Sequence, residues 1–351
     1  MFFGRERDRS GEALVTRRDE LDEAGRLESE GRRAEAITLL AEANRSSRDL
    51  AIELNLRRLR HLEGIALIEN APADPHFARP AAHAPELDPE SGVPECGVSD
   101  LTPELLRASI LRHGCLLVRG LMDGEDAEQM ARGIERSVVV RSDLRGGGED
   151  PDGFYDEFEP EPPYKVGERA WIEEGGGVLA TDSPRLMYDM LDGFERVGLS
   201  KLIAEYLGER PAISAQKCTL RKATPDIPGA WHQDGKFLGD VRSLNVWLSL
   251  SRCGDVAPSM DIVPRRIDHH VETGGEGTFL HIQISQATAE KEAGEVGIVR
   301  PIFNPGDALL FDELFLHQTG SDPSMPNPRY AIESWFFGPS AYPANYVPIA
   351  F

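Results

Sequence analysis

The second half of the chain alternates apolar and polar residues in the manner of half-buried β-strands. Residues 243–250 (SLNVWLSL) place leucine or valine at every second position, with Asn245 and Trp247 between them. Successive side chains of a strand point to opposite faces, so this segment predicts a strand with one apolar and one mixed face. Two further β-rich runs occupy 307–311 and 330–337.

The first 70 residues have a helical pattern instead. Apolar residues recur at three- and four-residue spacing at 34–41 and again at 52–59, with a polar break between the two runs. This predicts two helices within 18–63. Residues 31–36 (GRRAEA) resemble the first helix of a tetratricopeptide repeat, but a lone repeat cannot bury its own face. We therefore expect residues 1–70 to form a helical hairpin, a single TPR-like unit, that packs on the main domain or binds a partner protein.

Prolines mark a boundary after these helices. Six of them fall in residues 71–98, which predicts a linker or an arm lying on the surface. A new domain is expected over 99–351, with a helix at 105–113, a short buried strand at 114–120 and an amphipathic helix at 124–138. Helices followed by strands indicate an α+β chain whose second half is a β-sandwich or small barrel.

Residues 145–169 are rich in glycine, proline and acidic residues and show no regular pattern. Such a segment inside a compact domain is either disordered or a functional flap. Aromatic residues interleaved with the polar ones favour the flap: Phe154, Tyr155, Phe158 and Tyr164.

The composition argues against two classes of partner. The 351 residues include 38 Lys and Arg against 60 Asp and Glu, which gives a formal net charge of −22. Nucleic acids and anionic membranes attract basic surfaces, so we expect neither to bind. No apolar run could span a bilayer, and the first residues lead directly into charged ones, unlike a signal peptide. Because the four cysteines also lack C-x-x-C spacing, we expect a cytoplasmic protein with reduced thiols.

Two histidines and one aspartate are the strongest chemical signal. His232 and Asp234 lie in WHQDG, and residues i and i+2 of an extended chain point to the same face. His317, in LHQTG, can join them only if the two segments lie side by side. Two imidazoles and a carboxylate form the facial triad of non-haem Fe(II) oxygenases, which leaves metal positions open. Arg329, twelve residues after His317, makes the combination more specific than a lone His-x-Asp.

From about residue 101 to 342 the chain resembles the phytanoyl-CoA dioxygenase-like family of Fe(II)/2-oxoglutarate oxygenases. The resemblance rests on motifs that occur in the family's order: HGCLLVRGLMDGEDAEQM, WHQDG, LNVWLSL followed by DIVP, NPGDALLFDELFLHQTG and PRYAIESWFF. It implies a double-stranded β-helix (jelly roll) core with flanking helices.

The resemblance also implies roles for individual residues. His232, Asp234 and His317 would be the iron ligands. Arg329 would hold the distal carboxylate of 2-oxoglutarate, for which a planar two-pronged guanidinium is suited. Three further residues would line the co-substrate pocket, although the last of them could equally be a plain core residue: Thr319, Gln216 and Trp247.

Two features near these motifs bear on the pocket. Family members commonly have Pro-Gly-Ser-His after the DIVP-like strand, but this chain has Pro-Arg-Arg-Ile-Asp at 264–268, so their substrates are not transferable to it. Three of the six lysines flank WHQDG, and we expect their side chains to be solvated: Lys217, Lys222 and Lys236.

The implied activity is the hydroxylation of an unactivated C–H bond of a small molecule. O₂ and 2-oxoglutarate would be consumed, and succinate and CO₂ released. The alternatives are a catalytically silent member that binds a partner protein through residues 18–63, and a hydrolase that uses the same ligands for zinc. Retention of all three ligands together with Arg329 favours the oxygenase, since a binding module has no need of that set.

Overall fold

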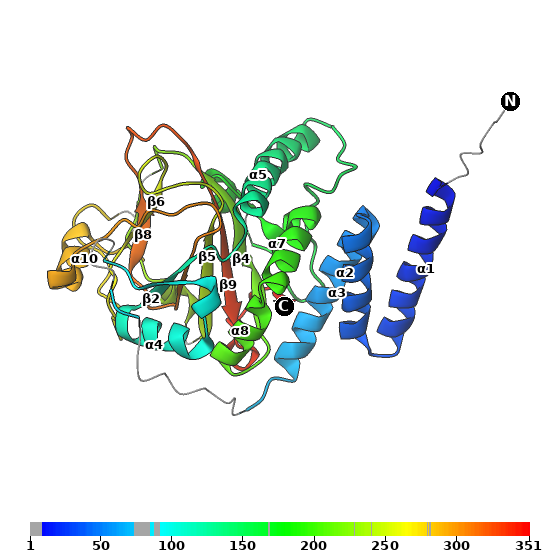
Figure 1. Ribbon diagram of the computed structural model, residues 1–351, viewed down its shortest axis with the longest axis horizontal. Helices are drawn as coiled ribbons and strands as arrows, with labels where there is room; N and C mark the ends of the chain where they lie inside the picture. Colours follow the sequence, from blue (N-terminus) through cyan, green and yellow to red (C-terminus); the bar gives the residue numbers. More distant parts are fainter. Residues whose placement is uncertain are drawn as a thin grey trace.

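A sheet of eight strands forms the centre of the protein, with helices against it (Figure 1). The computed structural model describes residues 9–73, 85–87, 92–167, 169–227, 229–239, 241–278, 280 and 282–351, without the side chains of 9–17. The large sheet has the order β1-β2-β7-β5-β9-β4-β10, and β3 also pairs with β4. Its strands are β1 (Glu95–Gly97), β2 (Cys115–Arg119), β3 (Gly177–Leu179), β4 (Ala212–Ala223), β5 (Ser243–Ser249), β7 (Ala308–Phe311), β9 (Arg329–Phe337) and β10 (Pro348–Ala350). A second sheet pairs β6 (Ser259–Ile262) with β8 (His317–Gly320).

Helices precede and punctuate these strands. They are α1 (Arg9–Ser29), α2 (Arg33–Ser46), α3 (Leu50–Glu69), α4 (Pro103–His113), α5 (Gly124–Arg145), α6 (Ala170–Glu174), α7 (Pro184–Arg196), α8 (Leu199–Leu207), α9 (Gly235–Leu238) and α10 (Gln286–Ala293). Among the described residues, no helix combines the length and the apolar character that a bilayer crossing requires. The α+β class predicted from the sequence is confirmed.

The central strand β5 separates two cores. Leu244, Val246 and Leu248 pack into one core with residues of α4, α5, α7 and α8. Trp247 points to the opposite face and packs in a second core with Met260 of the small sheet. The predicted alternation is confirmed, because the apolar face of β5 meets the helices and its mixed face meets the small sheet. The predicted runs at 114–120, 307–311 and 330–337 are β2, β7 and β9.

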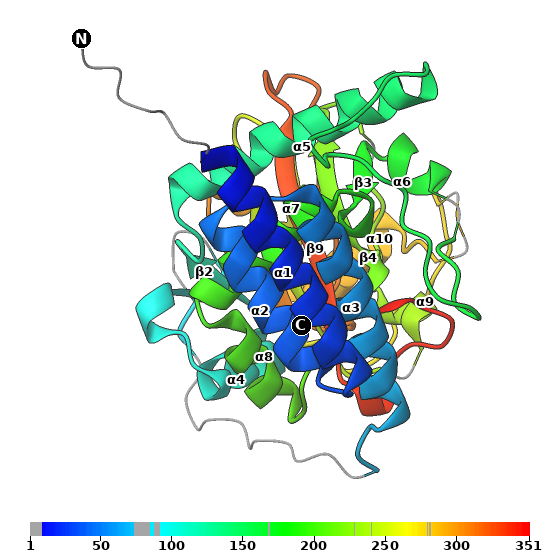
Figure 2. The ribbon, with the colours of Figure 1, turned by 90° about the vertical axis from the view of Figure 1, so that its right-hand side faces the viewer.

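The N-terminal unit contains three helices where two were predicted. The periodic runs at 34–41 and 52–59 lie in α2 and α3, and α1 precedes them. The sequence pattern missed α1, whose described part buries Ala24 and Leu27 in the core shared by these helices. Figures 1 and 2 show the three helices side by side as an outer layer, and α3 contacts both α7 and β10.

The inner helix α3 is fastened to the C-terminal strand. His61 Nδ1 donates to the carbonyl of Pro348 (2.8 Å), and His61 Nε2 accepts from the backbone N–H of Glu161 (3.1 Å). Burial lowers the pKa of His61, which suits a neutral ring that donates on one side and accepts on the other. A Cβ on Gly64 would lie only 2.8 Å from the backbone of Pro348. The three helices therefore join the large sheet through a close helix–strand contact.

Replacement of Gly64 by alanine should lower the free energy of unfolding by about 1–3 kcal/mol, because the added methyl group overlaps the backbone of β10. Chemical denaturation would measure the change. The matched control is Gly25→Ala in α1, where nothing lies within 4 Å of the new Cβ. This control should be neutral or stabilising by about 0.5–1 kcal/mol, since alanine is the better helix former. Equal stabilities for Gly64→Ala and wild type would contradict the docking of α3.

The Pro-rich arm over 71–98 ends inside the sheet. Residues 95–97 form β1, which pairs in parallel with β2. The end of the predicted linker is thus an edge strand of the main domain. Residues 74–84 and 88–91 of the arm lie outside the described residues.

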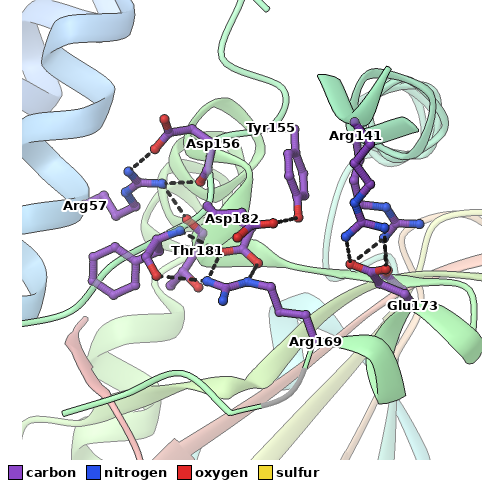
Figure 3. A network of polar contacts seen from close by, with 12 residues as sticks. Arg57, Arg141, Tyr155, Asp156, Arg169, Glu173, Thr181 and Asp182 are labelled. Carbon is purple, nitrogen blue, oxygen red and sulfur yellow. Dashed lines mark hydrogen bonds and ion pairs between the residues drawn. The ribbon is translucent and has the colours of Figure 1, made fainter. Parts of the chain in front are cut away.

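Asp182 anchors the segment 145–169, which was predicted to be a flap or a disordered insertion. Its carboxylate accepts from the backbone N–H of Phe158 (2.8 Å) and from the guanidinium of Arg169 (2.6 and 2.9 Å), as Figure 3 shows in part. A charged side chain bound from two sides fixes both the middle and the end of the segment.

Helix α3 of the N-terminal unit binds the same segment from the other side. Arg57 of α3 donates to the carbonyls of Asp156 (2.8 Å) and Thr181 (2.9 Å) and pairs with the carboxylate of Asp156 (Figure 3). Tyr155 and Phe158, which suggested a cover, are buried in hydrophobic cores. These two aromatic residues therefore contribute to hydrophobic packing. The flap interpretation then concerns only the residues of this segment that follow Phe158.

Candidate functional site

A short antiparallel bridge brings the two predicted histidines together. The backbone N–H of His232 donates to the carbonyl of His317 (3.0 Å), and the N–H of His317 donates back to the carbonyl of His232 (3.2 Å). The two ring centroids lie 4.4 Å apart. One ligand atom from each ring and one from Asp234 all lie within 4.8 Å of one another. The structure therefore gathers the three residues that the sequence singled out.

Both imidazoles present the same nitrogen to the carboxylate. Nδ1 of His232 contacts the carbonyl of Ala230 (2.7 Å), and Nδ1 of His317 contacts the carbonyl of Phe315 (3.1 Å), in each case two residues earlier. These contacts assign the proton to Nδ1 and leave the lone pair on Nε2. The two Nε2 atoms lie 3.9 and 3.7 Å from Oδ2 of Asp234. This arrangement presents two ring nitrogens and one carboxylate to a shared point, as a metal requires.

The protonation state of His317 fits this role. Burial, reinforced by the neighbouring His232, lowers the pKa of His317 to about 4, although Asp234 acts in the opposite direction. The ring is therefore neutral at pH 7, and no proton has to leave before a metal binds. Phe311 and Phe315 hold the ring in place at centroid distances of 4.9 and 5.9 Å.

Gln233, between the two ligands of WHQDG, fastens the motif to the body of the protein. Its side chain is fully buried and points away from the ligands. Its Nε2 donates to the carbonyls of His269 (3.1 Å) and Leu314 (2.6 Å), and its Oε1 accepts from Val271 N–H (2.8 Å). The sequence reasoning assigned no role to Gln233, although the i+1 position of an extended His-x-Asp must face away from the metal.

The triad opens into a cavity of about 630 Å³ between the large sheet and the small sheet. This volume lies in the range of pockets that hold small molecules. All seven residues predicted from the sequence line it: His232, Asp234, His317, Arg329, Thr319, Gln216 and Trp247.

Arg329 is a buried cation whose hydrogen-bond donors are not all used by the described residues. It starts β9 and is 1% exposed. Its Nη1 donates to the carbonyl of Ser259 (3.1 Å), its Nη2 is 3.8 Å from Glu333, and its Nε has no partner among the described residues. The guanidinium carbon lies 5.3 Å from the ring centre of Trp247. Because a buried charge needs a close counter-charge, this geometry suits an anion inside the cavity.

The three weaker pocket assignments differ in their surroundings. Trp247 lines the cavity beneath Arg329 and also packs on Phe303, so it is both a pocket residue and a core residue. Gln216 uses its amide on the protein itself, because Nε2 donates to the carbonyl of Lys165 (3.2 Å) and Oε1 accepts from Val347 N–H (2.8 Å). Thr319 lies on β8 opposite Met260, at the cavity wall.

Four charged residues that line the cavity were not predicted: Lys165, Lys217, Arg221 and Glu333. Lys217 was expected to be solvated, but it lines the cavity and only 24% of its side chain is exposed. Glu333 lies on the same wall, where burial raises its pKa but the charges of Arg221 and Arg329 outweigh burial and keep it low. The strand pattern offered a signal for Lys217 and Glu333. Side chains two or four residues apart on a strand share a face, so Lys217 lies on the same face of β4 as Thr219, and Glu333 lies on the same face of β9 as Arg329.

The sequence matches no model of a known protein family and no curated protein. Among solved structures it is similar to EctD from S. alaskensis with 2-oxoglutarate and 5-hydroxyectoine, at 16% identity over 77% of this chain and 86% of that chain, with a TM-score of 0.47. It is also similar to AviO1 from Streptomyces viridochromogenes Tue57 (18% identity, 67% and 95% coverage, TM-score 0.43). A third is the epimerase SnoN in complex with Fe³⁺, alpha ketoglutarate and nogalamycin RO (16% identity, 69% and 86% coverage, TM-score 0.45). Identities and TM-scores this low assign neither a family nor an activity to the chain.

Replacement of His232 or His317 by alanine should weaken the binding of a divalent metal by at least about 100-fold, because each residue supplies one of only three ligands. Titration calorimetry with Mn(II) would measure the affinity and a stoichiometry of one. His269→Ala is the control, since this exposed loop histidine contributes only its backbone carbonyl, to Gln233. Metal binding that survives in either triad variant would show that the three residues are not the ligands.

Proposed function

We propose that the protein is an Fe(II)- and 2-oxoglutarate-dependent oxygenase with a jelly-roll core, and that His232, Asp234 and His317 hold the iron. The observation that carries the proposal is the coexistence, in one cavity, of a three-residue cluster and a buried arginine whose Nε has no partner among the described residues and whose nearest carboxylate, Glu333, lies 3.8 Å away. Two nitrogens and one carboxylate are a donor set that suits iron and leaves positions for other ligands. The likeness of the motifs to the phytanoyl-CoA dioxygenase-like family supports the same assignment.

In this proposal, the iron supplies the activation of O₂ that converts 2-oxoglutarate to succinate and CO₂ and oxidises a C–H bond of a small molecule. Arg329 binds the distal carboxylate of 2-oxoglutarate, and its Nε and Nη atoms offer a bidentate contact. Trp247 supports the guanidinium from below, and Thr319 offers a hydroxyl on the facing wall. Gln216 acts indirectly, since its amide holds the cavity wall around Lys165.

The arrangement of the two sheets supports the jelly-roll assignment. Met260 and Ile262 of β6, the strand paired with β8, pack in one apolar core with side chains of β5, β7 and β9 of the large sheet. Isolated bridges extend the small sheet on both sides, from Val299 beside Ile262 to His232 beside His317. The ligands then lie on the inner face of one sheet and Arg329 on the inner face of the other.

A binding protein that acts through residues 18–63 is less well supported. Within residues 18–63, which the structure describes with side chains, the apolar residues of the core pack among themselves and on Tyr188 of α7. They therefore leave little apolar surface for a partner.

Hydroxylation is the outcome that we propose for the oxidised C–H bond.

Replacement of Arg329 by methionine should weaken 2-oxoglutarate binding by roughly 30- to 1000-fold, because a charge-assisted bidentate contact in a buried site is lost. Metal affinity should not change. Anaerobic calorimetry on metal-loaded protein would measure both constants. The matched ligand is 2-oxobutyrate, which keeps the 2-oxo acid but lacks the distal carboxylate, so its affinity should be the same in wild type and variant. An equal loss for both ligands would contradict the assigned contact.

The activity itself is tested by succinate formation. Wild-type protein loaded with Fe(II) in the absence of O₂, and then exposed to O₂ and 2-oxoglutarate with a panel of metabolites, should release succinate in step with an oxidised product. His317→Ala should release none. Product oxidation without succinate release would contradict the proposal.

A further inference from the structure

The cavity has a charge opposite to that of the chain as a whole. The chain carries a formal charge of −22. Among the described residues, however, the cavity wall has four cations and two carboxylates, which leaves a net charge of +2: Lys165, Lys217, Arg221, Arg329, Asp234 and Glu333. A divalent metal and a dicarboxylate co-substrate would cancel each other and leave this surplus unchanged. A cationic pocket in an acidic protein favours an anionic ligand.

Most of these charges already have partners. Arg221 and Glu333 form a two-pronged pair at 2.8 and 3.1 Å. Arg329 is assigned to the co-substrate, and Asp234 to the metal. Lys165 is exposed at the edge of the cavity, where water screens its charge. Of the cations that line the cavity, Lys217 is the buried one to which these assignments give no partner.

Lys217 has free donors that point into the cavity. Its position on β4 follows from an irregularity between Ile213 and Cys218, where the pairing with β9 shifts. The ammonium lies 3.7 Å from the ring centre of Phe237 and 3.8 Å from Oδ1 of Asp234. Both distances exceed a hydrogen bond, and Nζ donates none to any residue in the described part of the chain. All three N–H groups are therefore available to a ligand.

The contact with Asp234 does not satisfy Lys217 in the loaded site. A carboxylate that ligates a dication has shared its charge and no longer neutralises a nearby ammonium. The stem of Lys217 is largely buried, so the ammonium gains only part of its hydration from the cavity. An anionic group of the ligand is the partner that would compensate for this loss.

The edge of the cavity is apolar. Trp171 of α6 is 65% exposed and Leu280 is 38% exposed, although both are large hydrophobic side chains, and both line the cavity. Ile172 and Ile282 also line the cavity. Exposed apolar residues around an opening suit the apolar part of a ligand.

We propose that the substrate is an organic carboxylic acid whose carboxylate pairs with Lys217 and whose apolar part lies against Trp171 and Leu280. This inference rests on the proposed function, since it concerns the substrate of that site. Arg221, the nearby cation on the same strand, is already paired with Glu333, so Lys217 offers one ammonium, which matches a monoanion better than a phosphate group that commonly engages several donors. Lys217 is thus a specificity-determining residue.

The test compares three ligands of equal chain length and different charge. Full-length protein is loaded with Mn(II) and 2-oxoglutarate, and decanoate, decanamide and decyltrimethylammonium are titrated by calorimetry. We expect decanoate to bind about tenfold or more tightly than decanamide, because only the carboxylate forms a charge-assisted pair. The cationic ligand should not bind.

The variants assign this preference to one side chain. Lys217→Met should bind decanoate and decanamide equally, and Lys217→Arg should keep the preference. Lys222→Met is the matched control from the same strand, because Lys222 pairs with Glu135 outside the cavity and its loss should leave the preference unchanged. A preference that persists in Lys217→Met would overturn the inference.

The two proposals fail in different ways. Wild type that does not bind 2-oxoglutarate after metal loading would contradict the proposed function. Wild type that binds 2-oxoglutarate but does not distinguish decanoate from decanamide would contradict only the role of Lys217. A loss of 2-oxoglutarate affinity in Lys217→Met would also overturn the inference, since it would assign the ammonium to the co-substrate.

Discussion

Two backbone hydrogen bonds between His232 and His317 join segments that lie 85 residues apart in the sequence. The chemistry of the site depends on this pair, because the strand geometry around it decides which side chains share a face. His232 and Asp234 face His317, while Gln233 faces away and binds three backbone groups of the surrounding loops. The candidate metal site is therefore held by main-chain pairing, and its three side chains would need little reorganisation to meet a metal.

The large sheet supplies the opposite wall and separates two different environments. One face of β5 packs against helices and is wholly apolar, while the other carries Asn245 and Trp247 towards the cavity. Arg329 emerges on this inner face and is almost completely removed from water. In such surroundings a charge interacts strongly with an approaching ion, and this is the physical basis of the carboxylate roles proposed for Arg329 and Lys217.

Local patterns predicted the parts of the fold that depend on one segment alone. The alternation at 243–250 located β5 and both of its faces, and the motifs singled out His232, Asp234 and His317, which the fold brings together. The sequence did not indicate β1. This strand lies in the Pro-rich stretch, and it forms by pairing with β2, a separate segment of the chain. The burial of Lys217 was missed for the same reason. Its environment is created by Asp234 and Phe237, which approach it only in the folded chain.

The outer helices illustrate the limit of composition arguments. The sequence left open whether residues 1–70 pack on the main domain or bind a partner, and in the structure α3 packs on β10 through Gly64 and His61. Arg57 of the same helix also holds Asp156 and Thr181, close to the segment that leads into the cavity wall. These contacts give the helices a structural connection to the site, which no single-segment pattern could have revealed.

A crystal structure of the protein grown without O₂ in the presence of Mn(II) and 2-oxoglutarate tests the central claim most directly. The account predicts an anomalous peak for the metal between Nε2 of His232, Nε2 of His317 and the carboxylate of Asp234. It also predicts 2-oxoglutarate with its distal carboxylate on Arg329. A metal bound elsewhere, or a co-substrate that does not touch Arg329, would contradict the account.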